Sequence, residues 1–394
     1  MKVVILSSLS WSLLNFRGPL IAKMVANGHE VIACAPDFEP DVVAALRQMG
    51  AHFRRTPMAR AGTNPLRDLS TLLMYMRLLL RERPDLVVAY TQKPIIYGGI
   101  AARWTTRARL FPIMSGLGYV FSVASHHRHL LRLVVSRLYR LAIAKAECVF
   151  VFNGDDRREM LESNILDARQ RVLQVPGSGV DTNHFREQPL PEGPATFLMI
   201  GRLMRDKGVG EYVAAAQIVR QTVPDARFLL LTRPETENPT GYTAAELEAW
   251  RAAGTIEFIP ETRDVRPHLA RAHVFVLPSY YREGLPRTIL EALATGRPVI
   301  TTDMPGCREP IRPGVNGSLV PPQDAPALAR AMLAMVADRA ALAAMSRAAR
   351  HTAVSGYDVA HVNALLLDVM ALGPVPSPTP ARPRAIDGLT RETA

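Results

Sequence analysis

The sequence has few of the residues that mark a secreted or metal-binding chain. Its three cysteines, Cys34, Cys148 and Cys307, are far apart and in no metal-ligand spacing, which predicts free thiols in a reducing compartment. No apolar run approaches the roughly 18–20 residues that cross a bilayer. The first residues, MKVVILSSLSW, predict a buried strand rather than a secretory signal. We therefore expect a cytoplasmic protein that does not span a membrane.

Acidic residues are scarce in the first half. Residues 1–190 hold 25 Lys and Arg against 15 Asp and Glu, a net charge of +10, whereas residues 191–394 hold 22 against 21. An excess of positive charge in one half indicates an anionic partner for that half. The basic residues lack interleaved aromatic residues, so nucleic acid is disfavoured and anionic lipid or a phosphate-bearing acceptor is expected. An Arg-rich composition without any such partner is the other interpretation.

The remaining composition is that of a folded protein with two domains. The chain has 394 residues, of which 48% are apolar and 21% are charged, and a chain of this length usually divides into two cores. Strand patterns alternate with helical patterns twice, first from KVVIL to VLQVPGSGVD and then from TFLMIGR to PVITT. This alternation predicts two α/β lobes, each with a parallel, doubly wound sheet.

A segment with Pro and Gly, EQPLPEGPA, separates the two series of strands and helices. We predict a first Rossmann-like lobe over residues 1–186, a second over 187–370, and a Pro-rich disordered tail over 371–394. Ligands of open α/β sheets bind at the carboxyl ends of the strands. The site is therefore expected in a cleft between the lobes, with one substrate on each side.

One candidate anion site lies in the segment PSYYREGLPRTILEALATGRPVI. Pro286 suits the first position of a helix, which leaves the amides of Gly284, Leu285 and Arg287 free to face an anion. Glu283 precedes them, and Glu291 lies on the predicted helix, where its carboxylate can accept two hydrogen bonds from a ribose diol. An ordinary helix N-terminus with acidic residues near it would have the same pattern.

A second candidate site follows the strand TFLMI, in IGRLMRDKG. Arg202 and Lys207 can both reach a diphosphate there, the guanidinium through paired hydrogen bonds and the ammonium as a point charge. The GxxxxGK[ST] pattern of nucleotide hydrolases is absent, which argues against that kind of phosphate loop. Two solvated basic side chains are the alternative.

Together these segments resemble the signatures of the family 4 retaining glycosyltransferases, which have the two-lobed GT-B fold. EGLPRTILEALATGRPVI resembles that family's EGxPxxxLEAMAxGxPVI pattern, GRLMRDKG its GRLxxxKG pattern, and SGVDTNHF its NGVD-x-x-x-F sequence. The resemblance covers nearly all of residues 1–370. It implies transfer of a sugar from a nucleotide diphosphate donor with retention of configuration, and with no metal or cofactor. The sequence contains no Asp-x-Asp, which disfavours the metal-dependent GT-A design.

The resemblance also implies a role for each candidate residue. Arg202 and Lys207 would hold the donor diphosphate and stabilise charge on the leaving group. Glu283 would contact the transferred sugar, and the two residues after it would supply backbone contacts to sugar and phosphate. Glu291 would bind the donor ribose.

The first lobe has a narrower resemblance. YTQKPIIYGGIAARW and FPIMSGLGYVF are similar to a bacterial subgroup that extends undecaprenyl-diphosphate-linked sugars, including α-1,3-N-acetylgalactosaminyltransferases. Many family members have a cleft histidine after this strand, but here Ser115, Gly116 and Gly118 occupy that place, so no catalytic histidine is assigned. The glycines would permit close approach to donor or acceptor, or would only form a tight turn.

The stretch SHHRHLLRLVVSRLYRLAIAK (125–145) predicts a basic amphipathic helix. Its His126, His127 and His129 have no acidic or Cys partner nearby, so a metal site is not expected. Such a helix can lie on an anionic leaflet, which fits a lipid-linked acceptor. A packed helix with a solvated basic face is the other interpretation.

These inferences predict a transferase that is peripheral on the cytoplasmic face of the inner membrane. The expected donor is a nucleotide sugar, with UDP favoured over GDP and N-acetylhexosamine favoured over hexose. The expected acceptor is a lipid-diphosphate-linked saccharide of O-antigen, capsule or exopolysaccharide assembly. The alternatives are hexosyl or mannosyl transfer to another acceptor, and a UDP-sugar epimerase of the GT-B fold. Base selectivity is expected to depend on loops near 232–242 and 259–265.

Overall fold

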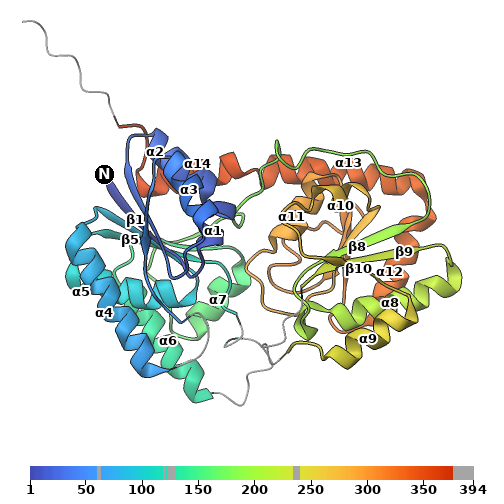
Figure 1. The fold of residues 1–394 in the computed structure, drawn as a ribbon, viewed down its shortest axis with the longest axis horizontal. Coiled ribbons are helices and arrows are strands. Elements are labelled where there is room, and N and C mark those ends of the chain that lie inside the picture. Colours follow the sequence, from blue (N-terminus) through green and yellow to red (C-terminus); the bar gives the residue numbers. More distant parts are fainter. Residues whose placement is uncertain (60–63, 119–120, 122–128, 234–239, 376–394) are drawn as a thin grey trace, which may run out of the picture.

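The computed structural model describes residues 1–59, 64–118, 121, 129–233 and 240–375 (Figure 1). The predicted tail beyond residue 375 lies outside the described residues, as do His126, His127 and the start of the predicted basic helix. Figure 1 shows two α/β lobes side by side, the first in blue to green and the second in green to orange.

The first lobe contains, in its described residues, a seven-stranded parallel sheet with the order β3-β2-β1-β4-β5-β6-β7. Its strands are β1 (Lys2–Leu6), β2 (Glu30–Ala35), β3 (His52–Arg55), β4 (Leu86–Tyr90), β5 (Arg109–Met114), β6 (Val149–Val151) and β7 (Val172–Gln174). The inner strands β1 and β4 are almost wholly buried, as expected for parallel strands covered on both faces.

Helices cover both faces of this sheet. One face packs against α1 (Ser10–Asn15), α2 (Gly18–Ala26), α3 (Pro40–Gln48) and α14 (Val359–Met370). The other face packs against α4 (Pro65–Glu82), the π-helix η1 (Pro94–Gly98), α5 (Gly99–Thr105), α6 (His129–Ile143) and α7 (Gly154–Glu162). The three cysteines of the chain are free and buried, which confirms that they form no disulfide.

The described residues of the second lobe form a six-stranded parallel sheet with the order β10-β9-β8-β11-β12-β13. Its strands are β8 (Thr196–Ile200), β9 (Arg227–Thr232), β10 (Glu257–Pro260), β11 (Val274–Leu277), β12 (Val299–Thr302) and β13 (Gly317–Val320). Its helices are α8 (Val209–Thr222), α9 (Ala244–Ala253), α10 (Arg266–Ala270), α11 (Arg287–Ala294), α12 (Ala325–Ala337) and α13 (Arg339–Gly356).

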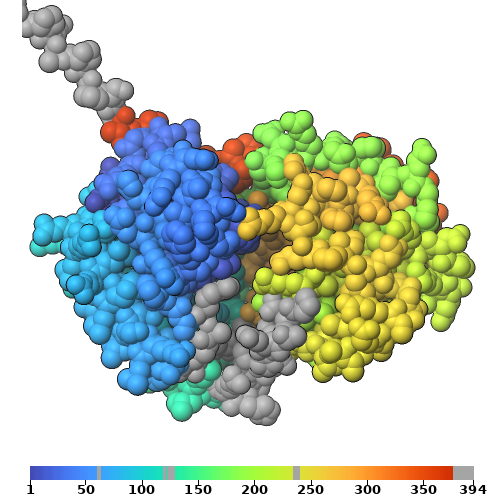
Figure 2. Space-filling view, in the orientation of Figure 1, coloured from blue at the N-terminus to red at the C-terminus, as the bar shows by residue number. Residues whose placement is uncertain are grey.

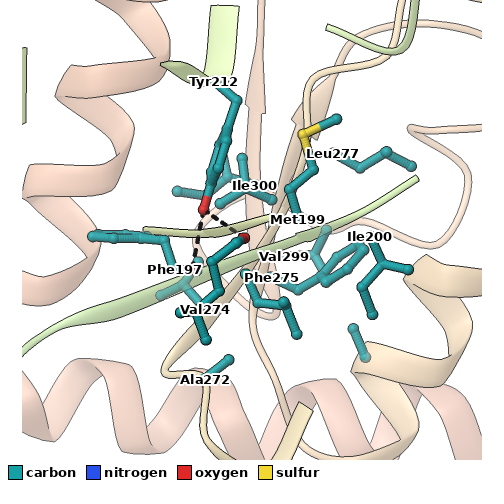
Figure 3. Packing of buried hydrophobic residues seen from close by; sticks show 14 of the residues in the cluster. Phe197, Met199, Ile200, Tyr212, Ala272, Val274, Phe275, Leu277, Val299 and Ile300 are labelled. Carbon is teal, nitrogen blue, oxygen red and sulfur yellow. Dashed lines mark hydrogen bonds between the residues drawn. The ribbon is translucent and has the colours of Figure 1, made fainter. Parts of the chain in front are cut away.

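Helix α8 contributes to the core of the second lobe beside β8 and β9. Tyr212 of α8 is fully buried, and its hydroxyl lies between the carbonyls of Phe197 and Leu229, 3.0 and 3.1 Å away (Figure 3). A buried phenol needs such a partner to offset the loss of water. This contact helps to fix β8, whose last residue leads into the candidate diphosphate site.

The last helix does not belong to the lobe that its sequence position predicts. After α13 the chain crosses back at Tyr357, whose carbonyl accepts a hydrogen bond from the amide of Val180, 2.8 Å away. Val362, Leu366 and Met370 of α14 then join the core of the first lobe. The end of the segment assigned to the second lobe therefore packs on the first.

The sequence patterns missed several elements at the edges of the sheets. Strands β3 and β13 were not predicted because edge strands carry short apolar runs; in β3 no residue is buried, and Phe53 is only partly covered. Helix α3 was also missed, although Pro40 at its start is a favourable first residue. In α11, Pro286 is the residue before the helix rather than its first residue.

Candidate active site

The candidate residues of the second lobe follow the two strands at the centre of its sheet. The strand order reverses between β8 and β11, and ligands of open α/β sheets bind where the order reverses. Arg202 follows β8, and Glu283 follows β11. The parallel register therefore brings together two motifs that are about 80 residues apart in the sequence.

A cavity of about 760 Å³ is lined by residues of both lobes, whose blue and yellow surfaces meet in Figure 2. The first lobe lines it with Leu9 in the loop after β1, with Trp11 and Asn15 of α1, and with Phe16 at the end of α1. The second lobe contributes Arg202, Thr232, Arg233, residues 261–265, Arg287 and Glu291. Residues of both loops that were expected to control base selectivity, Thr232, Arg233 and 261–265, thus line this cavity.

Glu291 lies on the wall of this cavity and is 8% exposed. Burial raises the pKa of its carboxyl to about 7, against the opposing effect of the Arg287 guanidinium, whose Nε donates to Glu291 Oε1 at 3.0 Å. Arg287 also donates to the backbone carbonyl of Asn15 in the first lobe. A single arginine therefore links the candidate ribose ligand to the opposite lobe.

Lys207 and Glu283 form an ion pair from the two motifs. Their side chains are 13% and 15% exposed, so the pair is screened from bulk water while its edge stays accessible. The ammonium also lies 5.5 Å from the centre of the Tyr281 ring, and Ser279 Oγ lies 3.4 Å from the carboxylate. This arrangement places a cation and an anion beside each other at the ends of β8 and β11.

The Asp206 carboxyl interacts electrostatically with both members of this ion pair and with Arg202. Burial raises the pKa of its carboxyl, and the charges of Lys207 and Arg202 oppose that shift while Glu283 adds to it. Arg202 is exposed and lines the 760 Å³ cavity, whereas Lys207 and Glu283 lie beside that cavity and not on its wall. Arg202, Asp206, Lys207 and Glu283 therefore form one charged cluster. Arg202 lines the cavity, and the other three residues do not.

The predicted glycine positions are where the two lobes touch. A Cβ atom on Gly284 would lie 2.3 Å from the carbonyl oxygen of Ser115, and one on Gly116 would lie 2.7 Å from the Gly284 amide nitrogen. Gly116 and Gly118 have φ of 112° and 69°, which favours glycine. The close approach that these glycines permit is therefore between the lobes. Leu285 packs against both cores.

Three side chains that contribute to this geometry, those of Arg287, Asp206 and Asn153, were not selected from the sequence. Arg287 could have been found, since it lies four residues before Glu291 on one helix face. Asp206 lies inside the GRLMRDKG motif itself. Asn153 after the strand ECVFVF predicts a helix N-cap, but its contact with the second lobe has no signal in the sequence.

The arrangement suits a nucleoside diphosphate that carries a sugar. A buried carboxylate faces a cavity large enough for a nucleoside, and cations lie where phosphates would follow. The amides of Gly284 and Leu285 donate to no described backbone carbonyl, and Gly284 is buried against Ser115 and Gly116 of the first lobe. Among the described residues, no group of His, Cys, Asp or Glu side chains has the geometry of a metal site.

Two such lobes facing a nucleotide-sized cavity define the GT-B fold of glycosyltransferases. Solved structures of that fold superpose over almost the whole chain. Sucrose-phosphate synthase from Thermosynechococcus elongatus covers 94% of this chain and 98% of its own, with a TM-score of 0.76 and 19% identity. Anabaena HepE in complex with UDP covers 94% and 100%, with a TM-score of 0.75 and 18% identity.

Family models match both lobes. The model described as "Glycosyl transferase 4-like domain" matches residues 18–176, and the model "Glycosyl transferases group 1" matches residues 194–338. The chain belongs to this family of group 1 glycosyltransferases.

Curated relatives extend the match. An N,N'-diacetylbacillosaminyl-diphospho-undecaprenol α-1,3-N-acetylgalactosaminyltransferase of Campylobacter jejuni is 25% identical over 80% of this chain and 84% of its own length. A UDP-Gal:α-D-GlcNAc-diphosphoundecaprenol α-1,3-galactosyltransferase of Escherichia coli is 26% identical over 75% and 77%.

Proposed function

We propose that the protein transfers a sugar, with N-acetylhexosamine as the leading candidate, from a UDP-sugar to a saccharide linked to a lipid diphosphate. The observation that carries this proposal is the convergence of Glu291, Arg202 and the Lys207–Glu283 pair at the cleft end of one sheet. The two relatives above support the acceptor class, because both are named for transfer onto undecaprenyl-diphosphate-linked sugars. The name of the second supports a UDP donor.

In the proposed reaction the side chains of the protein bind and orient the substrates and stabilise the charge that develops. The Glu291 carboxylate accepts hydrogen bonds from the ribose, and Arg202 and Lys207 bind the diphosphate. As the bond between the sugar and the diphosphate breaks, negative charge grows on the leaving group, and both cations stabilise it. Glu283 contacts hydroxyls of the sugar. No side chain is assigned as a nucleophile, so we propose front-face attack by an acceptor hydroxyl, which retains configuration and passes its proton to the departing diphosphate. We also propose that the reaction needs no metal.

Titration with UDP tests donor binding directly. A ligand that binds only the folded state stabilises it by about 2.7 kcal/mol at 100 times its Kd, which corresponds to a rise of several degrees in the melting temperature. We expect UDP and its sugar conjugates to produce this rise and GDP to produce a smaller one, in thermal-shift assays. A transfer assay with EDTA, and NMR of the product anomer, then tests metal dependence and retention. No shift with either nucleotide would contradict the proposal.

We also propose that the outer face of the first lobe lies on an anionic membrane. Helices α4, α5 and α6 expose large apolar side chains to solvent: Leu66, Leu69, Leu73, Leu80, Trp104, Leu130, Leu133 and Val134. Exposed arginines lie among them, including Arg77 and Arg137. Apolar groups mixed with positive charge suit the boundary between lipid headgroups and acyl chains. In the described residues no helix has the length and apolar character of a membrane span.

Sedimentation with vesicles tests this surface. The protein is expected to bind vesicles that contain phosphatidylglycerol, and binding is expected to weaken as salt rises because exposed charges are screened. Replacing Leu69 and Leu73 with Ser should reduce the bound fraction at least tenfold. Val315→Ser, which alters an equally exposed apolar residue of the second lobe, serves as the control. Equal binding by the double variant and the control would refute the assignment.

A further inference from the structure

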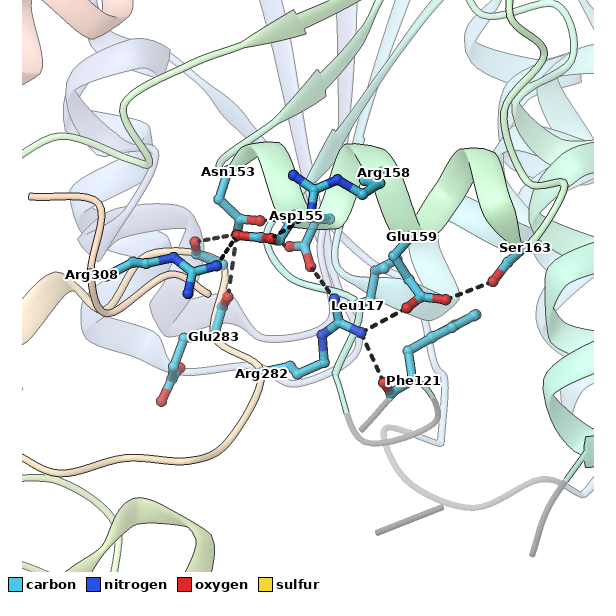
Figure 4. Close-up of polar contacts among 12 residues, drawn as sticks. Leu117, Phe121, Asn153, Asp155, Arg158, Glu159, Ser163, Arg282, Glu283 and Arg308 are labelled. Atoms are coloured by element: carbon cyan, nitrogen blue, oxygen red, sulfur yellow. Dashed lines mark hydrogen bonds and ion pairs between the residues drawn. The ribbon is translucent and has the colours of Figure 1, made fainter. Parts of the chain in front are cut away.

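Helix α7 of the first lobe begins beside the second-lobe loop that carries Glu283, and polar contacts join the two (Figure 4). We call these contacts the α7 clasp. Its members are Asn153, Asp155, Asp156 and Glu159 in the first lobe, and Arg282, Arg308 and the carbonyl of Gly284 in the second.

Asn153 is the central residue of the clasp. It is fully buried, and its Oδ1 caps α7 by accepting a hydrogen bond from the amide of Asp156 at 2.7 Å. Its Nδ2 donates to the carbonyl of Gly284 at 2.9 Å and to Asp156 Oδ2 at 3.0 Å. One side chain thus completes a helix in its own lobe and holds the backbone of the other.

Arg282 forms the second connection. Its Nη1 donates to Glu159 Oε2 at 2.9 Å and to the carbonyl of Phe121 at 3.1 Å, and its Nη2 lies 3.9 Å from Asp156 Oδ1. The three charged side chains are at most 15% exposed, so their interaction is only weakly screened by water. A third ion pair joins Arg308 to Asp155 nearby.

These contacts hold both neighbours of Glu283. Arg282 precedes it and Gly284 follows it, and each is bound by the first lobe. The Glu283 carboxylate, in contrast, pairs with Lys207 of its own lobe. The position of Glu283 relative to Lys207 is therefore set within the second lobe, and its position relative to the first lobe is set by the clasp.

We propose that Asn153 and Arg282 are positioning residues that align the Glu283 loop with an acceptor held by the first lobe. This inference rests on the proposed transferase function. The clasp couples approach of the lobes to assembly of the site. None of its contacts is to a side chain proposed to bind the nucleotide (Arg202, Lys207 or Glu291), so its loss should spare donor binding and impair transfer.

Two substitutions test this separation in the full-length protein. Asn153→Ser keeps an N-cap oxygen but has no amide to reach Gly284, and Arg282→Gln removes the charge that pairs with Glu159. We expect each to lower kcat about 10–100-fold, because small misplacements of reacting groups have effects of this size. The Kd of UDP should stay within threefold of the wild-type value. Arg282→Lys should recover part of the activity, and Arg157→Gln, at an exposed position on α7, is the matched control.

Small-angle X-ray scattering supplies a readout that does not depend on catalysis. We expect both clasp variants to have a larger radius of gyration than the wild type, because the lobes separate more often. A kcat within twofold of wild type, a Kd for UDP that rises in step with the loss of kcat, or unchanged scattering would overturn the proposal. If the wild type transfers no sugar from any donor, the proposed function fails, and scattering alone then decides on the clasp.

Discussion

Replacing Lys207 with Ala is expected to lower turnover by about 10²–10³-fold, the usual effect of removing one preorganised group that stabilises developing charge. In the structure this ammonium pairs with Glu283 at the end of β8, next to the exposed Arg202. Without it the leaving diphosphate loses one of two cations, and Glu283 loses its ionic partner. Initial rates at saturating donor, with the Kd of UDP measured separately, will separate loss of chemistry from loss of binding.

Arg205→Ala is the matched control for Lys207→Ala. Arg205 lies in the same short turn, but its side chain is 48% exposed and pairs with Glu246, so its removal should change turnover less than threefold. Circular dichroism and melting temperatures should show both variants folded. A folded Lys207→Ala protein with wild-type turnover would remove Lys207 from the site.

Replacing Glu291 with Gln is expected to raise the free energy of unfolding and, in the same variant, to lower the activity. Burial raises the pKa of this carboxyl to about 7, so above pH 7 the folded state holds a charge that burial disfavours. Gln removes that charge, and we expect about 3 kcal/mol of added stability at pH 8, from the difference between the unfolded pKa of 4.5 and the folded pKa of about 7. The amide oxygen of Gln also accepts hydrogen bonds from the ribose of the nucleotide sugar more weakly than the carboxylate does, so kcat/KM should fall about 100-fold.

The pH dependence gives the sign of this effect. Below the unfolded pKa near 4.5, Glu291 is protonated in both states and contributes no difference. Between pH 4.5 and about 7 the folded state binds the proton and the unfolded state releases it, so stability falls as pH rises. The gain from Glu291→Gln, measured by denaturant unfolding, should therefore be small at pH 4.5 and complete above pH 7.

Glu211→Gln provides the comparison for Glu291→Gln. Burial also raises the pKa of this half-buried carboxyl on α8, but the residue is not on the cavity wall. It should gain some stability and keep its activity. If Glu291→Gln retains full activity, the candidate ribose site is wrong, whatever its stability.

Local patterns in the sequence predicted most of the central architecture. Buried strands such as β4 and β8 have continuous apolar runs because both faces are covered, and helices such as α9 carry clear caps and a glycine stop. The order and spacing of these patterns predicted two lobes, each with a doubly wound sheet. The edge strands β3 and β13 were missed because most of their residues are partly or fully exposed and their composition resembles that of loops.

The two signature motifs were also evident from the sequence, since each is a continuous segment at the end of a strand. Arg202, Lys207, Glu283 and Glu291 could be selected in this way. Their roles as donor and sugar ligands stay predictions. The structure adds that Lys207 pairs with Glu283 and that Glu291 is buried enough for its pKa to approach neutrality. Neither property follows from a motif, because both depend on what lies around the side chain.

The sequence by itself determined the repeated strand and helix pattern and the residues that end each central strand, because these depend on neighbours along the chain. Only the tertiary structure decided which lobe α14 joins, how Asn153 reaches Gly284, and that Arg287 joins Glu291 to the first lobe. These contacts link residues that are about 130 to 340 positions apart. Their partners are selected by packing and by the need to pair buried polar groups, which no local pattern records.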